Sequence, residues 1–255
     1  MFDEPLSRGG SFIHRLDPRV RVACATACAI GLAALQHPAA AACGLLLAVL
    51  LLTLARPPWL ATLKRLAAVN VFILFMWLTV PAAMPGEALW SFGLLSFSRA
   101  GVGLMLLITL KCNALVILLM ALVASMNTAV LGAALARLRF PSKLAFMLLF
   151  AYRYVHVAAA EWRTLKTAAA LRGFAPRADM HTYRTIGYLL GMTFVRGLDR
   201  AARVSEAMLL RGFSGRFTSL AVFRASRVDA AFAAGFAVAL GVIICGDIYL
   251  GAFGG

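Results

Sequence analysis

One short motif occurs twice in the chain and each time places an arginine beside a glycine. Residues 168–177 read A-A-A-L-R-G-F-A-P-R, and residues 207–216 read A-M-L-L-R-G-F-S-G-R. The shared pattern, A-x-x-L-R-G-F-x-x-R, recurs after 39 residues and is too short for a solenoid repeat. A guanidinium can donate two parallel hydrogen bonds to acidic or carbonyl groups, so the chemistry that this motif offers is recognition of a partner surface.

Each copy of the motif also has the composition of a helix end. The glycine can take the left-handed conformation that closes a helix, the arginine complements the negative end of the helix dipole, and the phenylalanine can fold back on the last turn. Capping alone would account for one copy, but two copies on neighbouring helices favour a pair of docking contacts. The candidate docking residues are Leu171, Arg172, Gly173, Phe174, Leu210, Arg211, Gly212 and Phe213, with Arg177 and Arg216 as supporting residues.

Two long helices, which we call the docking helices, are predicted to carry these motifs. The first begins at Pro141, which suits the first turn of a helix, and runs without a breaker to Gly173. The second begins near Asp179 and ends at Gly212. Its apolar residues recur at spacings of three and four, which is typical of an amphipathic helix that packs on one side and meets water or a partner on the other. These apolar residues are Ile186, Leu190, Phe194, Leu198, Ala201, Val204 and Met208.

The rest of the chain is dominated by apolar runs. Hydrophobic residues make up 62% of the 255 residues and charged residues 14%, and the mean hydropathy is +0.87, which is the composition of a membrane protein. The stretch 140–160 is interrupted by Arg153 and His156, which leaves a sixth span open beside five clearer ones. The five runs that approach the ~20 residues needed to cross a bilayer are 20–36, 39–54, 66–84, 101–125 and 228–250.

These runs predict an all-α integral membrane protein with five to six transmembrane helices and two long cytoplasmic amphipathic helices. We expect four spans in 1–127, the docking helices in 128–227 and one last span in 228–255. Sixteen of the 25 Lys and Arg residues lie between positions 137 and 227. By the positive-inside rule, the N-terminus and this basic segment face the cytoplasm of a bacterial inner membrane, and the C-terminus lies outside.

Several other classes of protein fit the sequence poorly. The net charge of +15 does not require nucleic acid, because cationic cytoplasmic loops and anionic lipids account for it and no base-reading motif accompanies it. No glycine precedes any of the four lysines, as a phosphate-binding loop would need. The histidines are scattered and no carboxylates are paired, which argues against a membrane enzyme. Lys111 and Asn113 would be the candidates for a stand-alone carrier, and the role of Asp247 is open.

The two motifs occur together with F-A-Y-R-Y at 150–154 and I-H-R-L-D-P-R at 13–19. This combination resembles the transmembrane (T) component of energy-coupling factor transporters, over nearly the whole chain. The segment at 203–217, R-V-S-E-A-M-L-L-R-G-F-S-G-R-F, is most similar to the CbiQ branch, which serves cobalt and its nickel relatives. Leu171 and Leu210 stand where the family motif has alanine, which is a small departure.

The resemblance implies a non-catalytic protein that binds no metal, substrate or cofactor of its own. Its docking helices would bind a pair of ATP-binding cassette ATPase subunits through the Arg-Gly motifs. A separate CbiM-like membrane subunit would capture the substrate, and a small accessory membrane subunit is an optional further partner. Cobalt uptake is the favoured reaction, with nickel or a vitamin of the biotin type as the alternative.

Overall fold

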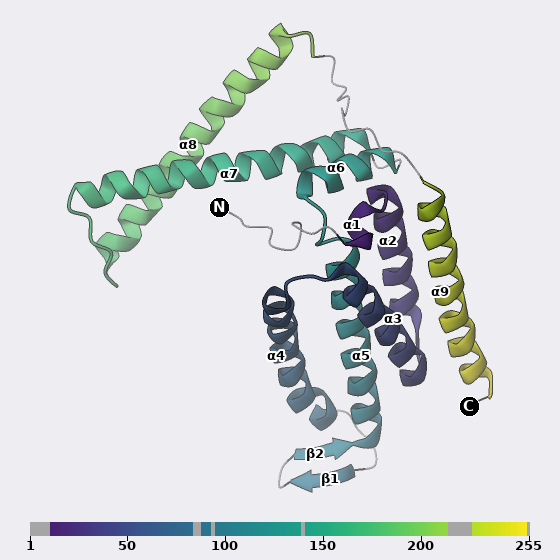
Figure 1. Cartoon of the computed structure of the whole chain (residues 1–255). Coiled ribbons are helices and arrows are strands. Elements are labelled where there is room, and N and C mark those ends of the chain that lie inside the picture. The colour runs from purple at the N-terminus through teal and green to yellow at the C-terminus, as the bar shows by residue number, and fades with distance from the viewer. Residues whose placement is uncertain (1–10, 84–87, 93–94, 139–140, 214–225, 254–255) are drawn as a thin grey trace. The chain divides into compact units, whose positions relative to one another are not determined.

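The computed structural model of the chain is mainly helical (Figure 1). It confirms the predicted fold class, an all-α integral membrane protein, because five of its helices are long and apolar enough to cross a bilayer. The structure describes residues 11–83, 88–92, 95–138, 141–213 and 226–253.

Two compact units make up the chain. The bundle unit contains residues 4–135 and 221–255, and the two-helix unit contains residues 1–3 and 136–220. The described helices of the bundle unit are α1 (Phe12–Arg15), α2 (Pro18–Ala34), α3 (Pro38–Ala55), α4 (Trp59–Ala83), α5 (Arg99–Leu122), α6 (Thr128–Arg137), whose last two residues belong to the other unit, and α9 (Arg227–Phe253). The described part of the two-helix unit consists mainly of α7 (Ser142–Leu171) and α8 (Met180–Leu210).

A short β-hairpin, which the sequence did not predict, connects α4 to α5. Its antiparallel strands are β1 (Ala88–Phe92) and β2 (Leu95–Ser98). Both strands are too short and too irregular in polarity to give a clear period-two pattern, so the segment reads as a plain loop in the sequence.

Four of the five helices of spanning length coincide with predicted spans. The first predicted run, 20–36, forms α2, which has 17 residues and is not among the five. The ambiguous stretch 140–160 lies in α7 from Ser142 onward, and α7 is one of the five by length and composition. The helical segments of spanning length are Pro38–Ala55, Trp59–Pro81, Arg99–Leu122, Lys143–Leu171 and Arg227–Ala252.

Prolines mark the first residues of two bundle helices. Pro18 and Pro38 begin α2 and α3, where a missing N–H costs no helical hydrogen bond. Asp17 caps α2 by accepting a hydrogen bond from the backbone N–H of Arg19 at 2.9 Å. At the other end of α3, Arg56 takes the left-handed conformation with φ 47° and stops the helix.

The core of the bundle unit lies among α2, α3 and α5. Leu32, Leu118 and Leu122 are fully buried there, and α3 packs more extensively on α5 than on any other described element. Small residues let the backbones approach, since a Cβ at Gly44 would collide with the Leu32 side chain. In lipid, such close van der Waals packing replaces the hydrophobic effect as the main attraction between helices.

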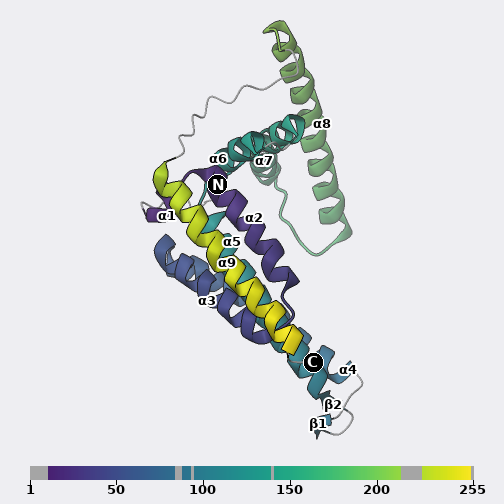
Figure 2. The same ribbon diagram turned by 90° about the vertical axis from the view of Figure 1, so that its right-hand side faces the viewer.

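The last helix, α9, lies beside α2 and α3 in the bundle unit (Figure 2). Figure 1 shows that α2 and α9 begin at the same end of the unit, so two helices far apart in the sequence run in the same direction. This pairing brings Asp17, just before α2, close to the first turn of α9.

The docking helices have the predicted bounds. α7 begins directly after Pro141, and α8 begins directly after Asp179, whose carboxylate accepts a hydrogen bond from the Thr182 N–H at 2.7 Å. The two helices cross each other (Figure 2). Their polar contact lies in the middle of α7, where Glu161 accepts hydrogen bonds from Arg196 at 2.5 Å and Arg200 at 3.4 Å.

Candidate functional site

The two Arg-Gly motifs have nearly the same backbone conformation. Arg172 has φ −90° and ψ 14°, and Arg211 has φ −89° and ψ 12°. Each is followed by a left-handed glycine, with φ 86° at Gly173 and 77° at Gly212. The repeat in the sequence is therefore a repeat in three dimensions at the level of the main chain.

Both helix ends are closed by the same pair of hydrogen bonds. In the first motif the Phe174 N–H donates to the Ala169 carbonyl at 3.1 Å, and the Gly173 N–H donates to the Ala170 carbonyl at 3.0 Å. This six-to-one and five-to-two pattern is the Schellman motif. The prediction that the motif caps its helix is confirmed here.

The second motif repeats these bonds at the end of α8. The Phe213 N–H donates to the Met208 carbonyl at 3.1 Å, and the Gly212 N–H donates to the Leu209 carbonyl at 2.9 Å. A Cβ at either glycine would meet nothing within 4 Å, so glycine is required by the backbone conformation and not by crowding.

The side chains of each motif differ in how far they are exposed. Phe174 and Phe213 are half-buried, and the Phe213 ring lies 6.2 Å from the Phe146 ring near the start of α7. The leucines point away, with 85% of Leu171 and 89% of Leu210 exposed. The phenylalanine therefore belongs to the packing of the two-helix unit, while the leucine makes little contact with the described residues.

The two arginines share the exposure of the leucines. Arg172 and Arg211 are both exposed, and neither guanidinium has a hydrogen bond or ion pair to another described residue. An exposed leucine next to an unpaired guanidinium combines an apolar anchor with a forked hydrogen-bond donor, which are two of the features that protein interfaces use. The arrangement suits binding and supplies no acid, base or nucleophile.

The supporting arginines are less informative. Arg177 is exposed in the turn between the docking helices, and its backbone N–H donates to the Thr182 hydroxyl at 3.0 Å. This bond and the Asp179 cap fix the start of α8 right after the first motif. The backbone hydrogen bond from Thr182 lowers the pKa of Asp179 below its usual value. Arg216 lies outside the described residues.

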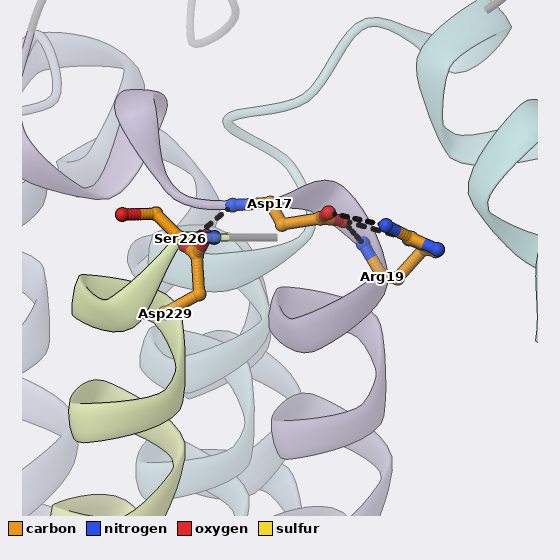
Figure 3. Close-up of polar contacts among 4 residues, drawn as sticks. All are labelled: Asp17, Arg19, Ser226 and Asp229. Carbon is orange, nitrogen blue, oxygen red and sulfur yellow. Dashed lines mark hydrogen bonds and ion pairs between the residues drawn. The ribbon is translucent and has the colours of Figure 1, made fainter. Parts of the chain in front are cut away.

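A polar cluster that was not predicted from the sequence joins the starts of α2 and α9 (Figure 3). The Asp17 carboxylate pairs with the Arg19 guanidinium at 2.8 Å, and these hydrogen bonds lower the pKa of Asp17. The Asp17 backbone N–H donates to Asp229 at 2.8 Å, and Asp229 also accepts from the Ser226 N–H at 2.7 Å. The S-x-x-D spacing of Ser226 and Asp229, typical of a capping box, was the available signal for the second half of this cluster.

The polar residues inside the apolar helices bond to other parts of the bundle. The Lys111 ammonium donates to the Ala33 carbonyl at 3.0 Å, close to the end of α2. Asp247 accepts backbone hydrogen bonds from Gln36 and His37, the latter at 2.8 Å. These contacts give Lys111 and Asp247 structural roles at helix ends.

Asn113 is paired with Asn70 across α4 and α5. Each side-chain amide donates to the carbonyl of the other, at 3.0 and 3.2 Å. The remaining amide N–H groups donate to the backbone carbonyls of Leu66 and Thr109, both at 2.9 Å. All four donors of the pair are thus satisfied without water, as a lipid environment demands.

Five apolar helices, α4 and α5 among them, are long enough to span a bilayer. They define the class of this molecule as a multi-pass membrane protein. Residues 9–220 match the sequence profile of the family CbiQ, described as cobalt transport protein. Since this match covers most of the chain, the protein belongs to the CbiQ family and is a membrane component of cobalt transport. No curated protein sequence matches the chain.

Proposed function

We propose that this chain is the transmembrane energy-coupling subunit of an ATP-driven energy-coupling factor importer for cobalt ions. In this role it passes the movement of two ATPase subunits to a separate membrane subunit that captures the metal. Nickel or a vitamin is the alternative substrate, because the substrate would be selected by the capture subunit and not by this chain.

The observation that carries the proposal is the duplicated helix end. Two motifs with the same backbone geometry each expose a leucine and an arginine that has no hydrogen bond or ion pair to the described part of the chain. Two equal contacts suit a partner that presents two equal grooves, as a pair of ATPase subunits would. Docking of α7 and α8 from the cytoplasmic side also agrees with the concentration of basic residues between positions 137 and 227.

The arginines are the first residues to test. We expect Arg172→Ala and Arg211→Ala each to weaken ATPase association by on the order of 2–5 kcal/mol, because a charge-assisted contact is lost from a buried interface. The two losses should be similar, and the double variant should nearly abolish cobalt uptake while membrane insertion stays normal. Lysine should restore part of the loss, since it keeps the charge and lacks the planar fork.

A purely structural role for the arginines makes a different prediction. If they only complement the helix dipole, the double variant loses ~0.3–1 kcal/mol of local stability at each helix end and transports normally. Cobalt uptake and co-purification of the ATPase, measured on the same preparations, separate the two cases. Full uptake by the double variant at normal expression would refute the coupling role. The proposal also requires that the isolated chain hydrolyses no ATP.

A further inference from the structure

The last helix of the bundle packs on the core through Phe236, Leu240 and Ile244, and an open cavity lies beside this contact. This cavity between α2 and α9 is apolar, has a volume of about 400 Å³ and is open on one side. It is lined by small residues such as Ala23 and Ala27 on α2 and Ala233 and Ala237 on α9, and by the larger Phe236, Leu240 and Ile244 of α9. In lipid, apolar side chains gain little from leaving the solvent, so apolar packing alone opposes sliding and rotation of a helix less than it would in water.

Polar contacts hold α9 at its first turn. Asp229 is 4% exposed, and each of its carboxylate oxygens accepts one backbone hydrogen bond, from Ser226 at the start of α9 and from Asp17 at the start of α2 (Figure 3). The bond to Asp17 joins residues 212 positions apart. It therefore fixes one helix start against the other.

A second carboxylate holds α9 near its other end. Asp247 is 9% exposed and accepts hydrogen bonds from the backbone N–H groups of Gln36, at 3.0 and 3.1 Å, and of His37, at 2.8 Å. These two residues form the turn between α2 and α3. The helices approach closely here, because a Cβ at Gly251 would lie 3.2 Å from the His37 ring.

The two carboxylates are spaced to act together. Asp247 follows Asp229 by 18 residues, which is about five helical turns, so both lie on the same face of α9 and roughly 27 Å apart along its axis. Their donors, at residues 17 and 36–37, bracket α2. All of these donors are main-chain groups of turns, which have no helical partner and need one in or near a bilayer.

We propose that Asp229 and Asp247 form a two-point clamp that fixes the rotation and register of α9 on α2. The described part of the second docking motif ends at Phe213, and α9 begins 14 residues later at Arg227. Movement of the docking helices enters α9 through this connection, and the clamp passes it on to α2 and α3. The transmission step rests on the proposed coupling function, whereas the clamp itself does not.

Register can be measured with the native Cys24, which lines the cavity between α2 and α9. Ala233→Cys and Ala237→Cys, made singly in a chain that keeps Cys24, place a second thiol one helical turn apart on the facing side of α9. Copper-phenanthroline oxidation in membranes gives a disulfide yield for each pair, and the ratio of the two yields reports the register. The remaining cysteines to replace by alanine are Cys28, Cys43, Cys112 and Cys245.

With the clamp intact we expect one pair to be strongly favoured. Asp229→Ala or Asp247→Ala should each reduce this preference about tenfold, the effect of losing a hydrogen bond to a charged group. The double variant should be little worse than either single variant, because release of one end already frees the register. Val228→Ala and Ile248→Ala are matched controls, since these exposed neighbours should leave the ratio unchanged.

The transmission step is measured on the complete transporter in liposomes, as cobalt taken up per ATP hydrolysed. The same single variants should lower this quotient about tenfold while ATPase binding stays normal. Asp229→Asn and Asp247→Asn keep one acceptor oxygen and the size of the side chain. Their cobalt uptake per ATP hydrolysed should lie between the values of wild type and the alanine variants. They replace an alanine variant that fails to insert into the membrane.

The outcomes are separable. An unchanged cross-linking ratio in the alanine or asparagine variants overturns the clamp, whatever the transport result. A changed ratio with a normal quotient overturns transmission through α9 and leaves the clamp. If the arginine variants of the docking helices transport normally, the coupling function fails, and the cross-linking ratio still decides the clamp by itself.

Discussion

The two docking motifs have the same main-chain conformation, but their side chains have different surroundings. Both end a helix with the same hydrogen bonds and the same left-handed glycine. Phe213 packs near Phe146 of the other docking helix, whereas Phe174 lines a cavity with Tyr188 and Met192 of α8. In both motifs the leucine and the arginine are exposed. A pair of identical partners would contact these shared residues in the same way.

After the arginines, the leucines give the largest expected effect on this comparison. Leu171→Ala and Leu210→Ala should each weaken ATPase association by roughly 1.5–3 kcal/mol, the value of burying one leucine side chain, because the proposed partner would cover each exposed leucine. Stability of the chain alone should change by less than about 0.5 kcal/mol. Binding of each variant to purified ATPase, compared with its melting temperature, checks both statements. A large difference between the two leucines would mean that the grooves are unequal.

The glycines should have a smaller and equal effect. Gly173→Ala and Gly212→Ala each force a side chain into the left-handed conformation, at a cost of about 1–2 kcal/mol. Since neither position is crowded, the cost is conformational, and asparagine should be better tolerated than alanine. Thermal unfolding of the purified chain measures it. Equal stability of wild type and Gly→Ala variants would show that these helix ends are not held as described.

Acid should produce the smallest effect, and only beside the first motif. Asp179 caps α8 and its pKa is lowered, so its contribution is present above the unfolded value of 3.8 and is lost as pH falls through the lower folded value. Asp179→Ala should therefore reduce the protection of the Thr182 amide from hydrogen exchange at pH 6, and the difference from wild type should shrink towards pH 3. A difference that is constant with pH would assign the effect to something other than the carboxylate.

The docking helices were the most predictable part of the molecule. Pro141 and Asp179 mark their starts and the Arg-Gly motifs mark their ends, and each of these signals acts through local backbone chemistry. The capping role of Gly173 and Gly212 was predicted for the same reason. The docking role of Arg172 and Arg211 stays a prediction, because it depends on a partner.

Contacts between distant segments could not be predicted. The hydrogen bonds from Asp17 to Asp229 and from His37 to Asp247 span 212 and 210 residues. Apolar periodicity identifies a membrane helix but does not say which helix lies beside it, so α2 and α9 gave no sign of being neighbours. Asp229 also falls at the edge of the last apolar run, where a single acid is easily taken for the end of the span.

The pairing of Asn70 with Asn113 bears on how the protein is made. α4 leaves the ribosome before α5, and until Asn113 arrives one amide N–H of Asn70 has no acceptor. A hydrogen-bond donor without an acceptor in hydrocarbon costs several kcal/mol of free energy. If α4 were released alone, its transfer into lipid would carry this cost. We expect α4 to remain at the protein-conducting channel until α5 is synthesised, and the two helices to enter the bilayer as a hairpin.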